Sequence, residues 1–364
     1  MPAYTMPYLK LIALDKLREG DWDRRQLSDA GGFWIPNIAN NGGDVRGLTL
    51  STNHSFKIVN KDGVPCIAAK KNVSGYGAML AFLATPDCLA NFPEFQILYM
   101  GMRIMTDTRL VDANIAHAYT GKRSITYKMT LEPDISYYVE LGSTIAGTDP
   151  TPIVYVNGKE IKGTIVASDP SPLYRIGVDI LSDVAPIGGT VYYTDPYIHV
   201  SHESRATGFL GDIDIRTSDM ELVTPGGWST SSGSSELTPI DAINAKKTDA
   251  TTPSVQLSKS GAESVIKCDL TKIGAEAEFV AACFNLSTYR EPSSSYTTFV
   301  QVGRFYDGGR EYVTTARVTP ADRLSAITVQ NISIPIITQG YILESNFDKV
   351  KPIRIETTIK SIKV

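Results

Sequence analysis

Hydrophobic residues recur at every second position through most of this chain. The clearest run is "SITYKMTLEP", residues 124–133, in which the hydrophobic positions are Ile125, Tyr127, Met129 and Leu131. A period of two predicts a β-strand with one face in a core and the other in water. The same pattern recurs in "FQILYMGMRIM", "SYYVELG", "GTVYYTDPYIHV", "TTFVQVGRFY" and "IRIETTIKSIKV". The chain is therefore predicted to be mostly β.

Glycine, proline, asparagine and aspartate separate these runs at short intervals, which favours a sandwich or barrel over alternating strands and helices. Two hairpins are specific enough to place. "VYVNGKEI" has Asn157 and Gly158 between its strands, and "RFYDGGREYV" has a turn at residues 307–309. Asn-Gly and Asp-Gly suit type I′ turns because both central residues need positive φ. Helix is expected only at residues 11–27 and 319–327, where Thr319 precedes a proline.

The length of 364 residues favours two domains. A change in composition after about residue 202 marks the boundary, because the following stretch is rich in Ser, Thr, Gly and Pro and poor in strand patterns. We predict an N-terminal arm over residues 1–29, a first β domain over 30–202, and a smaller C-terminal β domain over 203–364 that begins with this loop.

Charge and composition argue against several classes of partner. There are 35 basic and 39 acidic residues, and no basic run is interleaved with aromatics, so nucleic acid is not an expected partner. No apolar segment approaches the roughly 20 residues that span a bilayer, and the N-terminus lacks the pattern of a secretory signal. We expect synthesis in a cytoplasm. Four cysteines without ligand spacing are predicted to be buried and reduced: Cys66, Cys88, Cys268 and Cys283.

Two segments resemble the second half of a laminin-G or concanavalin A-like jelly roll. They are "SYYVELGSTIAGTDPTPIVYVNGKEIKG", residues 136–163, and "GGTVYYTDPYIHVSH", residues 188–202. Earlier strands of that fold fit "GDVRGLTLST", "GYGAMLAFLA" and "FQILYMGMRIM" loosely. The resemblance implies a jelly-roll β-sandwich over residues 30–202.

The stretch over residues 208–270 resembles the segment that follows a jelly roll in many tailed-bacteriophage virion proteins. The matching residues are Phe209, Leu210, Gly211 and Asp212, then Pro225, Gly226, Gly227 and Trp228, then Asp269 and Leu270. The resemblance implies a non-enzymatic component of the tail, its fibre or collar, or the head surface. Its partners would be copies of itself and other virion proteins. The alternatives are a lectin-like module for host glycan and, third, a polysaccharide depolymerase.

Asp212 and Asp214 are the strongest candidates for a catalytic pair. On a strand they share one face with Arg216, about 7 Å apart, which is near the separation of glycosidase carboxyls. Jelly-roll hydrolases of the laminarinase type carry a motif that resembles Glu-x-Asp-x-x-Glu. Here the first position is Asp212 and the last is Thr217, and no glutamate occurs within residues 208–220. We interpret the two aspartates as part of a solvated charge ladder and predict no catalytic residue.

Metal and cofactor sites are not predicted either. His199 and His202 are three residues apart, so on a strand they face opposite sides and cannot share a zinc ion. Asp44 and Asp195 offer oxygen ligands for calcium, as in some laminin-G relatives, but no Asp-x-Asp-x-Asp-Gly loop is present. The chain also lacks a Gly-x-Ser-x-Gly elbow and a phosphate-binding loop.

Trp34 and Trp228 stand in glycine-rich loops and are the candidate ligand-binding aromatics. An exposed tryptophan there would offer a platform for a sugar ring. The alternatives are that each one packs at the end of the sandwich, or is buried against a neighbouring subunit.

Overall fold

A computed structural model of the chain divides into two compact units, Met1–Arg216 and Thr217–Val364, each of which is taken by itself below. The structure describes residues 8–22, 46–50, 54–71, 77–78, 80–84, 97–144, 150–166, 174–180, 189–201, 209–224, 228–230, 238–244, 255–257, 263–269, 281–290, 296–306, 309–318, 328–338 and 354–363. The only secondary structure in these ranges other than strands and turns is one short helix.

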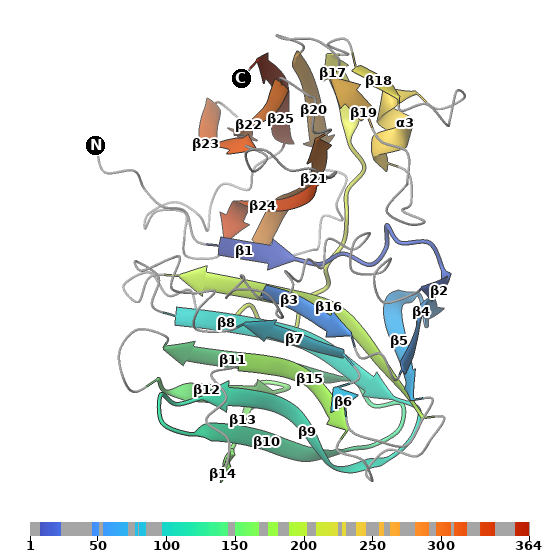
Figure 1. Cartoon of the computed structure of the whole chain (residues 1–364), viewed down its shortest axis with the longest axis vertical. Coiled ribbons are helices and arrows are strands. Elements are labelled where there is room, and N and C mark those ends of the chain that lie inside the picture. The colour runs from blue at the N-terminus through green and yellow to red at the C-terminus, as the bar shows by residue number, and fades with distance from the viewer. Residues whose placement is uncertain are drawn as a thin grey trace. The chain divides into compact units, whose positions relative to one another are not determined.

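The larger sheet of the first unit has nine antiparallel strands in the order β13-β12-β11-β8-β16-β5-β4-β2, with β1 paired to β16 (Figure 1). Their bounds are β1 Tyr8–Leu11, β2 Gly20–Trp22, β4 His54–Lys61, β5 Val64–Lys71, β8 Ile97–Thr106, β11 Tyr137–Thr144, β12 Pro152–Val156, β13 Lys159–Ile161 and β16 Thr190–Ser201.

The second sheet of this unit has seven antiparallel strands in the order β14-β10-β9-β15-β7-β3, with β6 paired to β15. Their bounds are β3 Arg46–Leu50, β6 Gly77–Ala78, β7 Leu80–Ala84, β9 Leu110–Tyr119, β10 Ser124–Leu131, β14 Thr164–Val166 and β15 Tyr174–Ile180. The β10 strand has the predicted alternation, since Tyr127 and Leu131 belong to the core and Ile125 and Met129 pack against it.

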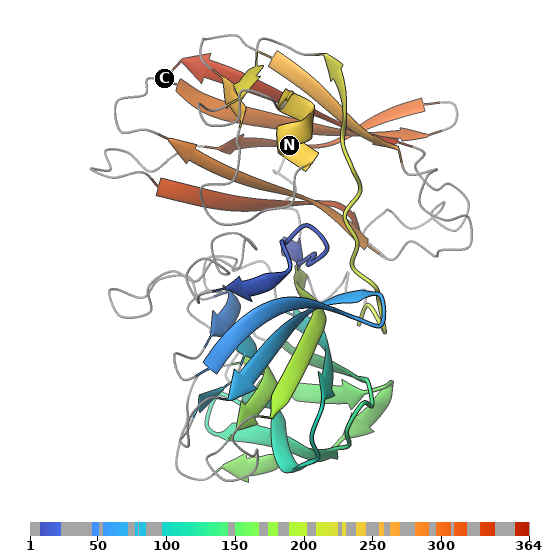
Figure 2. The same ribbon diagram turned by 90° about the vertical axis from the view of Figure 1, so that its right-hand side faces the viewer.

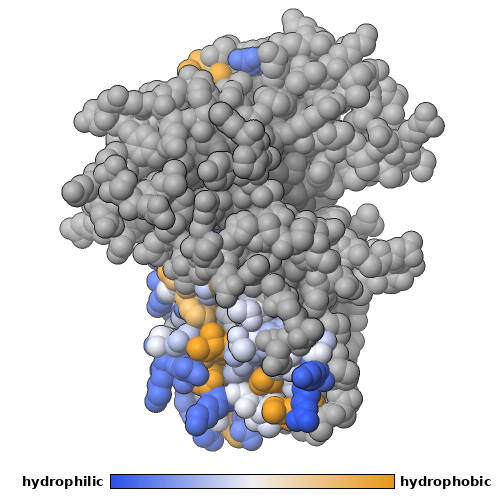
Figure 3. Space-filling model, turned by 90° about the vertical axis from the view of Figure 1, so that its left-hand side faces the viewer, coloured by the Kyte–Doolittle hydropathy of each residue, from blue (hydrophilic) through white to orange (hydrophobic). Residues whose placement is uncertain are grey.

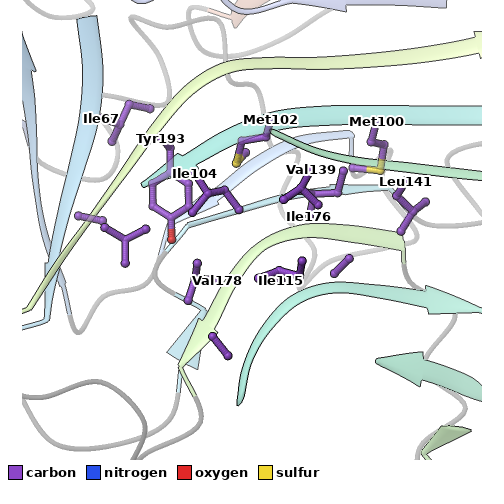
Figure 4. Packing of buried hydrophobic residues seen from close by; sticks show 14 of the residues in the cluster. Ile67, Met100, Met102, Ile104, Ile115, Val139, Leu141, Ile176, Val178 and Tyr193 are labelled. Carbon is purple, nitrogen blue, oxygen red and sulfur yellow. The ribbon is translucent and has the colours of Figure 1, made fainter. Parts of the chain in front are cut away.

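The two sheets bury one hydrophobic core between their inner faces. Figure 4 shows side chains of β8 and β11 facing those of β9 and β15. The labelled residues that are fully buried include Met100, Met102, Ile104, Val139, Leu141, Ile115, Ile176 and Val178. Alternate residues on each strand therefore point inward, and the predicted mostly β, jelly-roll-like sandwich is confirmed.

The helix predicted near the N-terminus is wrong over residues 11–22, which contain the last residue of β1, a turn and β2. The Ile12 N–H donates to the Pro196 carbonyl at 3.1 Å, and β1 pairs with β16. Ile12, Leu14 and Leu17 are buried in the core of the sandwich. The segment is extended because its backbone hydrogen-bonds to β16 and its apolar side chains complete this core. Residues 8–22 thus belong to the first unit and are not a separate arm.

The predicted hairpins are both present. Asn157 and Gly158 have φ of 49° and 74° between β12 and β13, as a type I′ turn requires. In the second unit, β22 (Tyr296–Tyr306) pairs with β23 (Gly309–Val318) through Tyr306 and Gly309. The helix predicted at residues 319–327 lies outside the described residues.

The second unit contains a five-stranded antiparallel sheet in the order β17-β20-β25-β22-β23 and two strand pairs, β18 with β19 and β21 with β24. The remaining bounds are β17 Glu221–Thr224, β18 Trp228–Thr230, β19 Val255–Leu257, β20 Glu263–Asp269, β21 Ala281–Arg290, β24 Thr328–Thr338 and β25 Arg354–Lys363.

The segment predicted as a loop contains a short helix, α3 (Pro239–Asn244). Its N-cap is Thr238, whose hydroxyl accepts from the Asp241 N–H at 3.3 Å while the Asp241 carboxylate accepts from the Thr238 N–H. The sequence Thr-Pro-Ile-Asp could have predicted the start of this helix, because threonine is a common N-cap residue and proline suits the first helical position.

Candidate functional site

An extended segment, residues 209–216, lies across the outer face of the nine-stranded sheet; we call it the strap. Phe209 packs edge-on against Tyr99 and Tyr155, with ring centroids 5.1 and 4.9 Å apart. It fits there because Gly142 has no side chain, and a Cβ at that position would lie 2.7 Å from the Phe209 ring. Leu210 is buried beside it. The strap therefore belongs to the first unit, and the division after Arg216 falls later than the boundary expected near residue 202.

Two buried carboxylates hold the backbone of the strap. Glu140 on β11 accepts from the Gly211 N–H at 3.0 Å and from the Tyr197 hydroxyl at 2.7 Å. Asp195 on β16 accepts from the Ile215 N–H at 2.7 Å. Burial raises the pKa of both carboxyl groups, and these hydrogen bonds oppose the rise by favouring the ionised forms. Since both are under 6% exposed beneath the strap, neither is open to a substrate.

Asp212 and Asp214 both bind one arginine from the sheet below. The Arg103 guanidinium donates to Asp212 at 2.6 Å and to Asp214 at 3.2 Å. Asp214 also lies 3.7 Å from Arg216, while Ile215 between them is buried. The alternation expected of the charge ladder is thus present. Each aspartate is thus one partner in an ion pair that shares Arg103, as a charge ladder requires. This arrangement supports the non-catalytic interpretation.

Of the residues considered as metal ligands, the structure describes Asp195 and His199. Asp195 accepts from Ile215 and also from the Thr194 hydroxyl at 3.1 Å, and Asp44 lies outside the described residues. His199 is fully buried, stacks on Tyr99 at 6.0 Å, and its burial lowers its pKa to about 4. His202 lies outside the described residues. Within the described ranges no three His, Cys, Asp or Glu side chains form a metal-binding group.

The candidate tryptophans stay predictions. Trp34 lies outside the described residues, and Trp228 is described only by its backbone, which pairs with Leu257. Cys66 and Cys268 are buried and are not joined in a disulfide, as predicted. The side chains of Cys88 and Cys283 are outside the described set. In the part of the chain that the structure describes, no helix is long and apolar enough to cross a membrane.

A second feature of the same sheet face is an open hollow of about 320 Å³ over β4, β5 and β16. Figure 2 shows the β4–β5 hairpin beside β16. The hollow is lined by polar and basic side chains together with a few apolar ones: Ser55, Lys57, Val59, Asn60, Lys61, Ala68, Lys70, Thr190 and Tyr192. Its floor is Ala68, which stands between Lys57 on β4 and Tyr192 on β16 in the register of the sheet. A small residue between two long ones leaves the depression.

Sequence reasoning missed this hollow. One signal was available, since Asp62 and Gly63 join the two strand-like runs "HSFKIVNK" and "VPCIAAKK". Their φ values of 54° and 86° belong to a tight hairpin turn. The other wall could not be read from the sequence, because β16 lies more than 100 residues further along the chain and its register with β5 depends on the whole sheet.

Figure 3 shows hydrophobic and hydrophilic residues intermixed on one face of the first unit. The exposed large hydrophobic residues among those described are Val111, Ile135, Ile165 and Val223. Single exposed apolar side chains are normal on a protein surface and mark no site by themselves.

The sequence matches no protein-family model and no curated protein. Among solved structures, the cellulose induced protein Cip1 is 11% identical with a TM-score of 0.29, over 45% of this chain and 92% of that one. The tandem CBM22 domains of Xyn10C from Paenibacillus barcinonensis are 7% identical with a TM-score of 0.25, over 89% and 96%. The binding domain of botulinum neurotoxin serotype C1 is 11% identical with a TM-score of 0.23, over 88% and 99%. Similarity at these scores carries no argument about function.

Proposed function

We propose that this chain is a non-enzymatic component of a tailed-phage particle whose first unit binds host surface glycan. The observation that carries the binding role is the open hollow on the nine-stranded sheet. Its volume of about 320 Å³ is at the small end of ordinary ligand sites, which run from about 300 to 1,000 Å³. A site of this size suits one or two sugar residues of a longer surface polymer.

The lining of the hollow suits a sugar. Ser55, Thr190 and Tyr192 contribute hydroxyl groups, Asn60 contributes an amide, and the lysines contribute ammonium donors. Sugar hydroxyls both donate and accept hydrogen bonds, so a mixed lining of this kind matches them. The hollow lies on rigid hydrogen-bonded strands, and a ligand would bind there at little cost in ordering the protein.

The virion role rests on the sequence resemblance of residues 208–270. Phe209, Leu210, Gly211 and Asp212, the first residues of that resemblance, form the beginning of the strap. The strap fixes where the chain leaves the first unit. We propose synthesis in the host cytoplasm, incorporation into the particle beside copies of itself and other virion proteins, and a position in the tail, its fibre or collar, or on the head.

A polysaccharide depolymerase is the weaker alternative. Among the described residues, the candidate pair Asp212 and Asp214 shares Arg103, and the two carboxyls with raised pKa, Glu140 and Asp195, are covered by the strap. Neither of these two pairs thus leaves both carboxyls unpaired and accessible to a substrate.

Ala68→Leu is expected to abolish glycan binding by filling the floor of the hollow. Because Ala68 lies on the outer face of β5, the larger side chain extends into the hollow and away from the core. Binding of the full chain to a glycan array is the measurement. Thr130→Leu on β10 of the other sheet is the matched control and should bind as the unchanged protein does. Unaltered glycan binding by Ala68→Leu would move the site elsewhere.

Assembly is tested by the mass of the purified chain in solution, from light scattering over a concentration series with negative-stain imaging. A defined oligomer or polymer is expected, since virion components act through repeated interfaces between copies. A protein that stays monomeric at every concentration and does not assemble when mixed with virion proteins would argue against a structural role.

A further inference from the structure

The hollow is built from two rows of side chains that cross three strands. The register aligns Ser55 on β4, Lys70 on β5 and Thr190 on β16 in the first row. Two residues along each strand, Lys57, Ala68 and Tyr192 form the second row. Side chains two residues apart share a face, so both rows point to the outside of the sheet. Lys70 therefore stands between two hydroxyl-bearing residues and next to the empty space above Ala68.

The three lysines of the lining differ in their partners. Lys57 pairs with Asp21 at 3.0 Å, and Lys61 pairs with Asp134 at 2.9 Å. The Lys57–Asp21 pair is exposed on both sides, and ion pairs between exposed groups contribute little free energy. Asp134 is exposed as well, whereas the Lys61 side chain is only 21% exposed. An incoming anion would therefore displace Asp21 from Lys57 at small cost. Lys70 forms no ion pair with a carboxylate of the described residues, so its charge is available to a ligand.

One face of the Tyr192 ring is covered by a lysine. The Lys61 ammonium lies over its ring, 4.4 Å from the centroid, in the geometry of a cation–π contact. A sugar ring cannot stack on the face that Lys61 covers. The ring instead holds a second positive charge at the hollow, and the lining is organised around charge more than around an aromatic platform.

We infer that the hollow takes an acidic saccharide, with the anionic group bound by Lys70 and flanked by Lys57 and Lys61. This inference rests on the proposed glycan-binding role and adds the class of ligand. Among the described residues that line the hollow there is no arginine, whose planar fork would select a bidentate partner. Lysine ammonium groups act as point charges and accept either a sugar carboxylate or a sugar phosphate. The shared chemistry is an anion on a sugar, with hydroxyls nearby for Ser55 and Thr190.

The test uses the full chain and matched pairs of oligosaccharides. One arm pairs carboxylated sugars, sialylated and uronic-acid oligosaccharides, with the same compounds as methyl esters. The other arm pairs phosphorylated sugars with their dephosphorylated forms. The acidic member is expected to bind about tenfold more tightly in at least one arm, and this advantage should shrink as salt rises from about 50 to 500 mM, because salt screens the charges of an open site.

Lys70→Gln is expected to lose about tenfold in affinity for the acidic member and little for the neutral one. Lys128→Gln is the matched control, since Lys128 is an exposed lysine on β10 of the other sheet. Circular dichroism and thermal unfolding verify that both variants fold. Equal binding of acidic and neutral members, or a Lys70→Gln variant that binds as the unchanged protein does, would overturn the inference and leave the glycan-binding role standing. Failure to bind any saccharide in either arm would overturn both.

Discussion

Gly101→Ala is expected to destabilise the first unit by about 3 kcal/mol, at the upper end of what overpacking a core costs. Gly101 lies in the middle of β8, and a Cβ there would lie 1.9 Å from the ring of Tyr197 on the neighbouring β16. Tyr197 is fully buried, and its hydroxyl donates to Glu140, so the ring cannot move aside without breaking this hydrogen bond. Urea unfolding of the full chain measures the loss.

A second substitution checks the cause. Tyr197→Leu removes the ring, so adding Gly101→Ala to it should cost much less than Gly101→Ala costs in the unchanged protein. A coupling of about 2 kcal/mol between the two positions is expected for residues in direct contact. Losses that simply add, or a Gly101→Ala variant with the original unfolding midpoint, would show that the ring does not set the requirement for glycine.

Arg103→Met is expected to cost about 2 to 3 kcal/mol and to loosen the strap. The substitution leaves the buried Asp195 carboxylate without the nearby guanidinium, 3.7 Å away, and removes the shared partner of Asp212 and Asp214. Loss of one partner of a buried charge is costly, about 3 to 5 kcal/mol when both partners are fully buried. The expected value is lower because Arg103 is 21% exposed.

Hydrogen exchange at the amides of Gly211 and Ile215 measures directly how firmly the strap is held, because these two amides donate to Glu140 and Asp195. Both should exchange faster in Arg103→Met. Asp214→Asn is the matched control: its side chain is 56% exposed, so the cost should stay under about 1 kcal/mol and both amides should stay protected. Protected amides in Arg103→Met would mean that the carboxylates hold the strap without the arginine.

The strands of the sandwich could be predicted where a period of two coincides with half-burial, as in β10. The turn at Asn157 and Gly158 was equally readable, because few residue pairs tolerate positive φ at both positions. The N-terminal segment was misread because Leu11, Leu14 and Leu17 recur every three residues, which also fits one face of an amphipathic helix. Its conformation depends on β16, which is distant in the sequence, so local propensity could not decide it.

The candidate site was harder to predict than the fold. The exposure of Asp212 and Asp214 followed from the alternation of residues, but their partner Arg103 is more than 100 residues earlier in the chain. The same holds for the hollow, whose rows join residues of β4, β5 and β16. Sequence patterns predict which face of a strand is exposed to solvent. They do not predict which exposed residues of different strands become neighbours, because the order and register of the strands in the sheet determine that.

Mapping a bound saccharide on the full chain tests the glycan-binding role most directly. The backbone amide signals would be followed by nuclear magnetic resonance during titration with the tightest ligand from the array. The shifts are expected to gather on the two rows of the hollow, at Ser55, Lys57, Ala68, Lys70, Thr190 and Tyr192. Shifts that gather on the other sheet or in the second unit, with these amides unchanged, would contradict the proposed site.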